Sequence, residues 1–273
     1  MSKLAKHPLC LTAILFVFMQ AAGYLAGYIS WQLLSHIPHL PEQAATYINM
    51  LITELLPFGA LLLVFKGVIT FLAEQKKSGL KASPSTTVPL FAHRLPYLLL
   101  FLPVIVQTGW DISSLFLEKI CIAPLSPSGL GLFLLCLSAT MSIALLEEMI
   151  WRKIILDAMC QKWDTVKGII ISSLLFGAVH YMNIINGQQT FAATTLQVIQ
   201  AIGMGMFLAC IYTRTNRFIL VVLIHGLCNF SNFFCNELIE WNYAGYPWDN
   251  ACQAAFTILY FAAAGLLLHA DNA

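Results

Sequence analysis

The stretch GLFLLCLSATMSIALLEEMIWRKII, residues 131–155, joins a long apolar run to two adjacent glutamates, an arginine and a lysine. About 20 consecutive apolar residues are enough to cross the hydrocarbon core of a bilayer as a helix. A charged side chain in that core costs about 2.5 kcal/mol or more when it has no partner. The stretch therefore predicts a membrane-spanning helix whose carboxylates, Glu147 and Glu148, are candidates for a function.

The composition of the whole chain agrees with a membrane protein. Of its 273 residues, 59% are hydrophobic and only 10% are charged, whereas soluble domains are about 25% charged. The formal net charge is +1, so no basic surface indicates nucleic-acid binding. We therefore expect the lipid bilayer and a membrane protein or peptide as partners, and no nucleic acid.

Most of the cysteines fall where a free thiol acts as a small hydrophobe. No CxxC motif occurs among the eight cysteines, so a zinc site made of thiolates is not expected. Cys235 and Cys252 would both face the outside, which leaves a disulfide between them as an open alternative. The cysteines expected inside apolar segments are Cys10, Cys136, Cys210 and Cys228.

The apolar segments predict an all-α, polytopic bundle of about eight spanning helices, with residues 1–273 forming a single integral-membrane domain. Residues 130–235 carry the polar motifs and form the expected catalytic core. The expected spans are residues 9–29, 53–73, 95–110, 130–156, 166–183, 191–213, 217–235 and 251–269.

The distribution of lysine and arginine predicts that both termini lie in the cytoplasm, in what we expect to be a prokaryotic inner membrane. Only Lys119 then lies clearly outside, and Lys66 falls within the second segment, from which its side chain would reach the inner interface. Glu54 is expected at the outer interface. The basic residues at cytoplasmic ends are Lys3, Lys6, Lys76, Lys77, Lys81, Arg94, Arg152, Lys153, Lys162, Lys167, Arg214 and Arg217.

Helical spacing separates the roles of the two adjacent glutamates. Glu148 and Arg152 are four residues apart with the acid first, the favoured order for an ion pair within a helix. Glu147 points about a quarter-turn away, so it needs water, a proton or a histidine from another helix. The structural alternatives are an ion pair that only anchors a helix end and an acid that reaches the headgroups.

Two further segments carry histidines within the expected membrane. His225 and Asn229 are four residues apart and share one helix face, and His180 follows Phe176 by the same interval. Counting ~1.5 Å per residue from the cytoplasmic ends gives depths of ~14 Å for Glu147, ~12 Å for His225, ~18 Å for Asn229 and ~20 Å for His180. These depths are compatible with one shared pocket, although polar contacts that only join helices are the alternative.

A carboxylate, two imidazoles and an amide in a wet pocket can hydrolyse a peptide bond. A partly desolvated carboxylate is a stronger base toward water, an imidazole can orient water or pass a proton, and an amide can donate to an oxyanion. His180, His225 and Glu147 could instead bind zinc. The HExxH spacing is absent, so the expectation is that the enzyme needs no metal or other cofactor.

Three motifs carry a resemblance to a known family: EEMIWR (147–152), FGAVH (176–180) and HGLCN (225–229). They match EExxxR, FxxxH and HxxxN of the CPBP family, which comprises the CAAX proteases and bacteriocin-processing (Abi) enzymes. The resemblance covers about residues 130–235. The chain departs from many relatives at Lys153, where they have glycine, and at Cys228, where asparagine is common.

The resemblance implies a glutamate-dependent intramembrane endopeptidase similar to the type II CAAX prenyl endopeptidases. In that scheme Glu147 is the general base on water, His180 and His225 assist it, and Asn229 stabilises the oxyanion. Glu148 and Arg152 are supporting residues. The residues leave two rivals open, a non-proteolytic scaffold or immunity protein of the same family and a transporter or channel.

Overall fold

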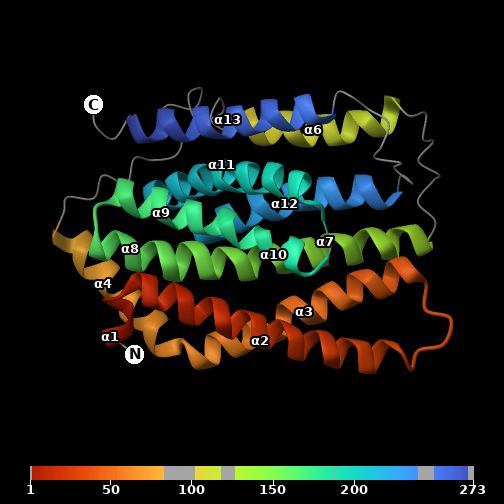
Figure 1. Ribbon diagram of the computed structural model, residues 1–273, viewed down its shortest axis with the longest axis horizontal. Coiled ribbons are helices and arrows are strands. Elements are labelled where there is room, and N and C mark those ends of the chain that lie inside the picture. Colours follow the sequence, from red (N-terminus) through yellow and green to blue (C-terminus); the bar gives the residue numbers. More distant parts are fainter. Residues whose placement is uncertain (1, 83–101, 118–126, 188, 239–248, 270–273) are drawn as a thin grey trace.

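The protein is a bundle of long helices (Figure 1). Its computed structural model describes residues 2–82, 102–117, 127–187, 189–238 and 249–269. The elements in chain order are α1 (Ser2–Ala5), α2 (Pro8–Leu34), α3 (Glu42–Val64), α4 (Lys66–Ala82), α6 (Leu102–Leu117), α7 (Pro127–Glu148), the π-helix η1 (Met149–Leu156), α8 (Asp157–Lys162), α9 (Thr165–Ala178), the 3₁₀ turn η2 (Val179–Tyr181), α10 (Met182–Ile185), α11 (Phe191–Thr215), α12 (Phe218–Leu238) and α13 (Asp249–His269).

The described helices have the lengths that a bilayer requires. Five stretches are long and apolar enough to cross it, and two shorter apolar helices lie within α12 and α13. With α6 they make up the all-α polytopic bundle of about eight helices that the sequence predicts. The five long stretches are Pro8–Leu34, Glu42–Val64, Leu130–Lys162, Thr165–Ile185 and Phe191–Thr215.

The second predicted span, residues 53–73, is wrong in its position. The chain crosses with α3 and leaves helical geometry at Phe65, where φ is −100° and ψ is 11°. Lys66, predicted inside the span, is instead the exposed first residue of α4. Hydropathy misses this break because Lys66 is the only charged residue between the apolar stretches 55–65 and 67–73.

The helices form layers (Figure 1). The hairpin of α2 and α3 packs on the continuous rod α7–η1–α8, and α12 packs beside α7. α11 packs between α9 and α13, and α6 contacts both α12 and α13. The start of α2 and the end of α13 lie at the same end of the bundle, on the left in Figure 1.

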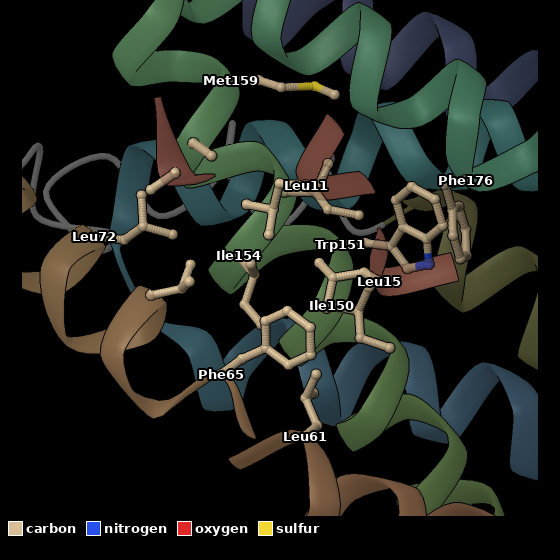
Figure 2. Close-up of a cluster of buried hydrophobic side chains, with 14 of the residues drawn as sticks. Leu11, Leu15, Leu61, Phe65, Leu72, Ile150, Trp151, Ile154, Met159 and Phe176 are labelled. Atoms are coloured by element: carbon tan, nitrogen blue, oxygen red, sulfur yellow. The ribbon is translucent and has the colours of Figure 1, made fainter. Parts of the chain in front are cut away.

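Buried apolar side chains join the α2–α3 hairpin to η1. Figure 2 shows Leu61 and Phe65, from the end of α3, against Ile150 and Ile154 of η1. All four are at most 7% exposed. Because lipid tails are as apolar as these side chains, close packing rather than water exclusion holds such helices together.

The outer surface is also apolar. Val17, Leu25 and Leu63 are 66%, 61% and 81% exposed, and contiguous apolar patches of this kind are rare on soluble monomers. These side chains face the lipid hydrocarbon, as expected for an integral membrane protein.

Part of the sequence-based expectation lies outside the described residues. This holds for Arg94, Lys119, Cys121 and residues 95–101 of the third predicted span, and for the side chains of Cys235 and Cys252. The cysteines expected in apolar segments are free thiols.

Candidate active site

The two glutamates lie where the rod changes from an α-helix to a π-helix. Glu148 ends α7, and Arg152 lies in η1. The Arg152 Nε atom is 3.0 Å from the Glu148 Oε2 atom, which is the ion pair that the spacing predicts. The sequence analysis missed the π-helical register, an uncommon geometry that occurs frequently at functional sites.

Glu148 has a second partner that the sequence analysis did not identify. The His225 Nδ1 atom, on α12, is 2.8 Å from the Glu148 Oε1 atom. Since a carboxylate only accepts, the imidazole donates its Nδ1 hydrogen in this bond. Glu148 therefore fixes both the tautomer and the orientation of the ring.

Glu147 lies at the other side of the same imidazole. The His225 Nε2 atom is 3.6 Å from the Glu147 Oε2 atom. The structure therefore joins Arg152, Glu148, His225 and Glu147 in one chain of contacts. It brings together the motifs of α7 and α12, as the depth estimate for Glu147 and His225 requires.

A glycine allows this close approach of α12 to α7. A Cβ atom added to Gly226 would lie 2.4 Å from the Met141 Sδ atom. The residue next to His225 must therefore be small for the imidazole to reach the glutamates. A second glycine, Gly205, presents its carbonyl 3.5 Å from the Arg152 Nη2 atom.

His180 lies in the 3₁₀ turn that ends α9 and is half-buried. Its Nδ1 atom donates to the Phe176 carbonyl oxygen at 3.1 Å, because a carbonyl can only accept. Its Nε2 atom is then the acceptor in the neutral ring. The contact that links His180 to the other site residues runs through the Phe176 ring rather than through a polar bond.

Phe176 is a shared contact of the whole site. Its ring centroid is 5.4 Å from that of His180 and 6.2 Å from that of His225. The Arg152 guanidinium lies 4.9 Å from the ring centre, within range of a cation–π contact. The Trp151 ring packs edge to face against the Phe176 ring, with 5.6 Å between the centroids, and Figure 2 shows the two side chains next to each other. The sequence analysis identified Phe176 only as the first residue of the FGAVH motif and did not predict this central position.

Asn229 lies one turn beyond His225 on α12 and is half-buried. Among the described residues, its amide makes no hydrogen bond. Its spacing of four residues from His225 places it on the same face of α12.

The burial of these groups is graded. The side chains of Glu148 and Arg152 are 0% and 2% exposed, whereas that of Glu147 is 31% exposed. Glu148 is thus sealed inside the protein and Glu147 is accessible. A site of this form can hold one carboxylate as a fixed structural charge and present the other to water.

Within the described ranges, no group of three or more histidine, cysteine, aspartate or glutamate side chains is arranged to hold a metal ion. His180, His225 and Glu147 do not form such a group.

Comparison with known proteins agrees with the geometry. Residues 129–231 match the family model described as type II CAAX prenyl endopeptidase, Rce1-like. No curated protein and no solved structure matches the chain. The matched segment contains the motif residues of α7, η1, η2 and α12 and excludes α2, α3 and α13.

Proposed function

We propose that this chain, a member of the CAAX-protease-like family by its Rce1-like residues 129–231, is an intramembrane endopeptidase that activates water with Glu147. The observation that carries the proposal is the contact chain in which Arg152 holds Glu148, Glu148 holds His225, and His225 faces Glu147. A buried carboxylate that orients a histidine beside an accessible carboxylate is an arrangement for proton transfer.

A shared water molecule matches the hydrogen-bonding capacities of His225 and Glu147. With its Nδ1 hydrogen given to Glu148, the neutral His225 ring offers only a lone pair at Nε2. This acceptor faces a carboxylate oxygen at 3.6 Å, and two acceptors need a shared donor. A water molecule can donate one hydrogen to each, which orients its lone pairs toward a substrate carbonyl.

Hydrolysis then follows in balanced steps. Glu147 takes a proton as the water oxygen bonds to the carbonyl carbon, and the carbonyl oxygen becomes an oxyanion. The Asn229 amide donates to that oxyanion, a contribution of about 10²–10³-fold for one such donor. When the C–N bond breaks, the proton passes to the leaving nitrogen directly or through His180, giving a carboxylic acid and an amine.

The substrate in this proposal is a membrane-embedded or lipidated peptide cut in the cytoplasmic half of the bilayer. Lys76 of α4 and Lys153 of η1 both lie beside the Tyr212 ring, near the C-terminal end of α11, whose last turn contains Arg214. Lys167 lies near the start of α9, the helix that follows α8. By the positive-inside rule we assign this end to the cytoplasm, and the start of α2 and the end of α13 lie at the same end of the bundle (Figure 1).

The proposal requires no metal. Glu147 supplies the base, Asn229 the oxyanion donor and Glu148 the fixed charge, so each role of a catalytic zinc has a protein group. Hydrolysis should therefore continue after dialysis against a strong chelator, and loss of activity that zinc restores would contradict this part.

The test compares the membrane peptides of cells that carry the wild-type protein with those of cells that carry Glu147→Gln. We expect an uncleaved precursor to accumulate only with the variant, because Gln cannot accept the proton. Glu42→Gln, which removes an exposed glutamate at the start of α3, is the matched control and should process normally. If both variants insert normally and neither changes any peptide, the chain acts as a scaffold and the hydrolytic mechanism is wrong.

A further inference from the structure

We infer that Lys153 of η1 and Lys76 of α4, beside the Tyr212 ring of α11, form a site for the phosphate group of an anionic phospholipid. These three residues and Asp157 of α8 are called the Tyr212 cluster below. None of the four belongs to the three motifs of the active site, and the inference does not depend on the proposed hydrolysis.

The Tyr212 ring is the centre of this cluster. It lies in the last turn of α11 and is fully buried. The Nζ atom of Lys76 is 4.0 Å from the ring centre and that of Lys153 is 5.9 Å from it, both within range of a cation–π contact. The two ammonium nitrogens are therefore no more than about 10 Å apart, one Debye length at 0.1 M salt, so each interacts with the charge of the other.

Asp157 balances one of these two positive charges. Its Oδ1 atom accepts a hydrogen bond from Lys76 at 2.9 Å, and its Oδ2 atom accepts one from the Tyr212 hydroxyl at 3.0 Å. Two ammonium groups and one carboxylate leave the cluster with one positive charge in excess. The C-terminal end of α11 contributes only about half a negative charge to this balance.

Lys153 is the cation that Asp157 does not hold. Among the described residues it makes no ion pair and no hydrogen bond. It is half-buried, whereas every other residue from Ile150 to Met159 is buried. The Lys76 side chain is 22% exposed and that of Asp157 only 6%. An anion that approaches the cluster therefore meets two accessible ammonium groups and a carboxylate that is largely covered.

The position of the cluster favours the phosphate of a lipid. Lys153 belongs to Leu130–Lys162, a stretch long and apolar enough to cross a bilayer, and Tyr212 lies within one turn of the end of another such stretch. The cluster is thus near the ends of the spanning helices. Basic pockets between such helices on the cytoplasmic side bind anionic headgroups, and we assign this end to the cytoplasm. A phosphodiester carries one negative charge, which equals the charge left in excess.

The cluster is separate from the proposed active site. Glu147 faces His225 of α12 at 3.6 Å, whereas Lys153 contacts Tyr212 of α11 and Asp157 contacts Lys76 of α4. A phosphate that accepts hydrogen bonds from both lysines would connect η1 with α4. We therefore expect the bound lipid to stabilise the packing of α4 and not to take part in hydrolysis.

The first test uses the wild-type protein in phosphatidylcholine vesicles with and without phosphatidylglycerol. Acetylation of each lysine is followed by mass spectrometry of peptides. We expect phosphatidylglycerol to slow the acetylation of Lys153 relative to that of Lys77, an exposed lysine of α4. An equal change at both lysines would show only a diffuse surface charge and would overturn the site.

The second test measures the binding of phosphatidylglycerol to the purified protein in a zwitterionic detergent by native mass spectrometry. One basic side chain near an anionic membrane surface contributes about fivefold in affinity. Lys153→Gln should therefore weaken binding by about fivefold, whereas Lys153→Arg, which keeps the charge, should bind like the wild type. Lys77→Gln is the matched control, because it removes the same charge from an exposed position. Unchanged binding in Lys153→Gln, or an equal loss in Lys77→Gln, would contradict the inference.

Inorganic phosphate distinguishes a lipid from a free anion. In phosphatidylcholine vesicles, inorganic phosphate should leave the acetylation of Lys153 unchanged, because a free ion lacks the acyl chains that keep a lipid at the protein surface. Protection equal to that by phosphatidylglycerol would overturn the lipid assignment. None of these measurements uses peptide hydrolysis, so a failure of the proposed endopeptidase mechanism would leave them unaffected.

Discussion

Replacing Glu148 by Gln tests whether one buried carboxylate both stabilises the bundle and orients the catalytic histidine. Glu148 is fully buried, 3.0 Å from Arg152 Nε through one oxygen and 2.8 Å from His225 Nδ1 through the other. Gln keeps the size but removes the charge, and it leaves a guanidinium that is 2% exposed without its nearest counterion. Breaking a buried ion pair from one side costs about 3–5 kcal/mol of unfolding free energy.

A second substitution separates the two roles. In the double variant Glu148→Gln with Arg152→Met, neither charge remains, and replacing a whole buried pair by apolar or neutral groups is often neutral for stability. We therefore expect the double variant to unfold near the wild-type midpoint. Its peptide hydrolysis should stay below that of the wild type by up to about 10⁴-fold, as for loss of the orienting carboxylate in a Ser-His-Asp triad. The Gln amide can turn its NH₂ group toward His225, so it no longer fixes the tautomer with the hydrogen on Nδ1.

The assay is equilibrium unfolding in mixed detergent micelles together with hydrolysis of an identified peptide. Asp164→Asn is the matched control, because it removes the charge from an ion pair with Lys167 in which both side chains are exposed. This substitution should leave stability and activity unchanged. The reasoning is refuted if Glu148→Gln unfolds like Asp164→Asn. The role toward His225 is refuted if the double variant regains hydrolysis along with stability.

Two further predictions concern the framework of the site. In Gly177→Ala the added Cβ atom would lie 2.8 Å from a backbone carbonyl oxygen of α11, so thermal unfolding should show a loss of about 1–3 kcal/mol of stability. Activity should fall as well, because the neighbouring Phe176 moves. Gly59→Ala is the control, since its added Cβ atom has nothing within 4 Å and its unfolding should not change. Asp157→Asn weakens the hydrogen bonds from Lys76 at 2.9 Å and from Tyr212 at 3.0 Å, which should lower the free energy of unfolding by about 1.5–3 kcal/mol. Chemical labelling of the Lys76 amine should increase while peptide hydrolysis continues. Unchanged labelling would show that these contacts do not hold α4 in place.

The sequence predicts the features that depend on local spacing. The Glu148–Arg152 ion pair needs only the geometry of one helix, and the shared face of His225 and Asn229 needs no more. The number of helices follows from apolar run length, because a bilayer leaves the chain few alternatives. For this reason the fold class is correct although one span is displaced.

Contacts between helices are the part that spacing does not predict. The bond from His225 to Glu148 depends on how closely α12 approaches α7, which Gly226 and Met141 decide together. The central position of Phe176 depends on the packing of α9 against both η1 and α11.

The two adjacent glutamates point about a quarter-turn apart on the helix, which gives one a structural role and the other the proposed catalytic role. Glu148 turns into the protein, where an ion pair with Arg152 and a hydrogen bond from His225 occupy its two oxygens and make it unsuitable as a base. Glu147 turns toward the accessible side, where no guanidinium binds it and a histidine lies slightly too far for a direct hydrogen bond. A carboxylate can accept a proton from water in a catalytic cycle only if its partners release it just as easily. Close contacts with Arg152 and His225 suit Glu148 to a structural role, and a catalytic base must lack such contacts. The two glutamates therefore have the same functional group but differ in role because their neighbouring residues differ.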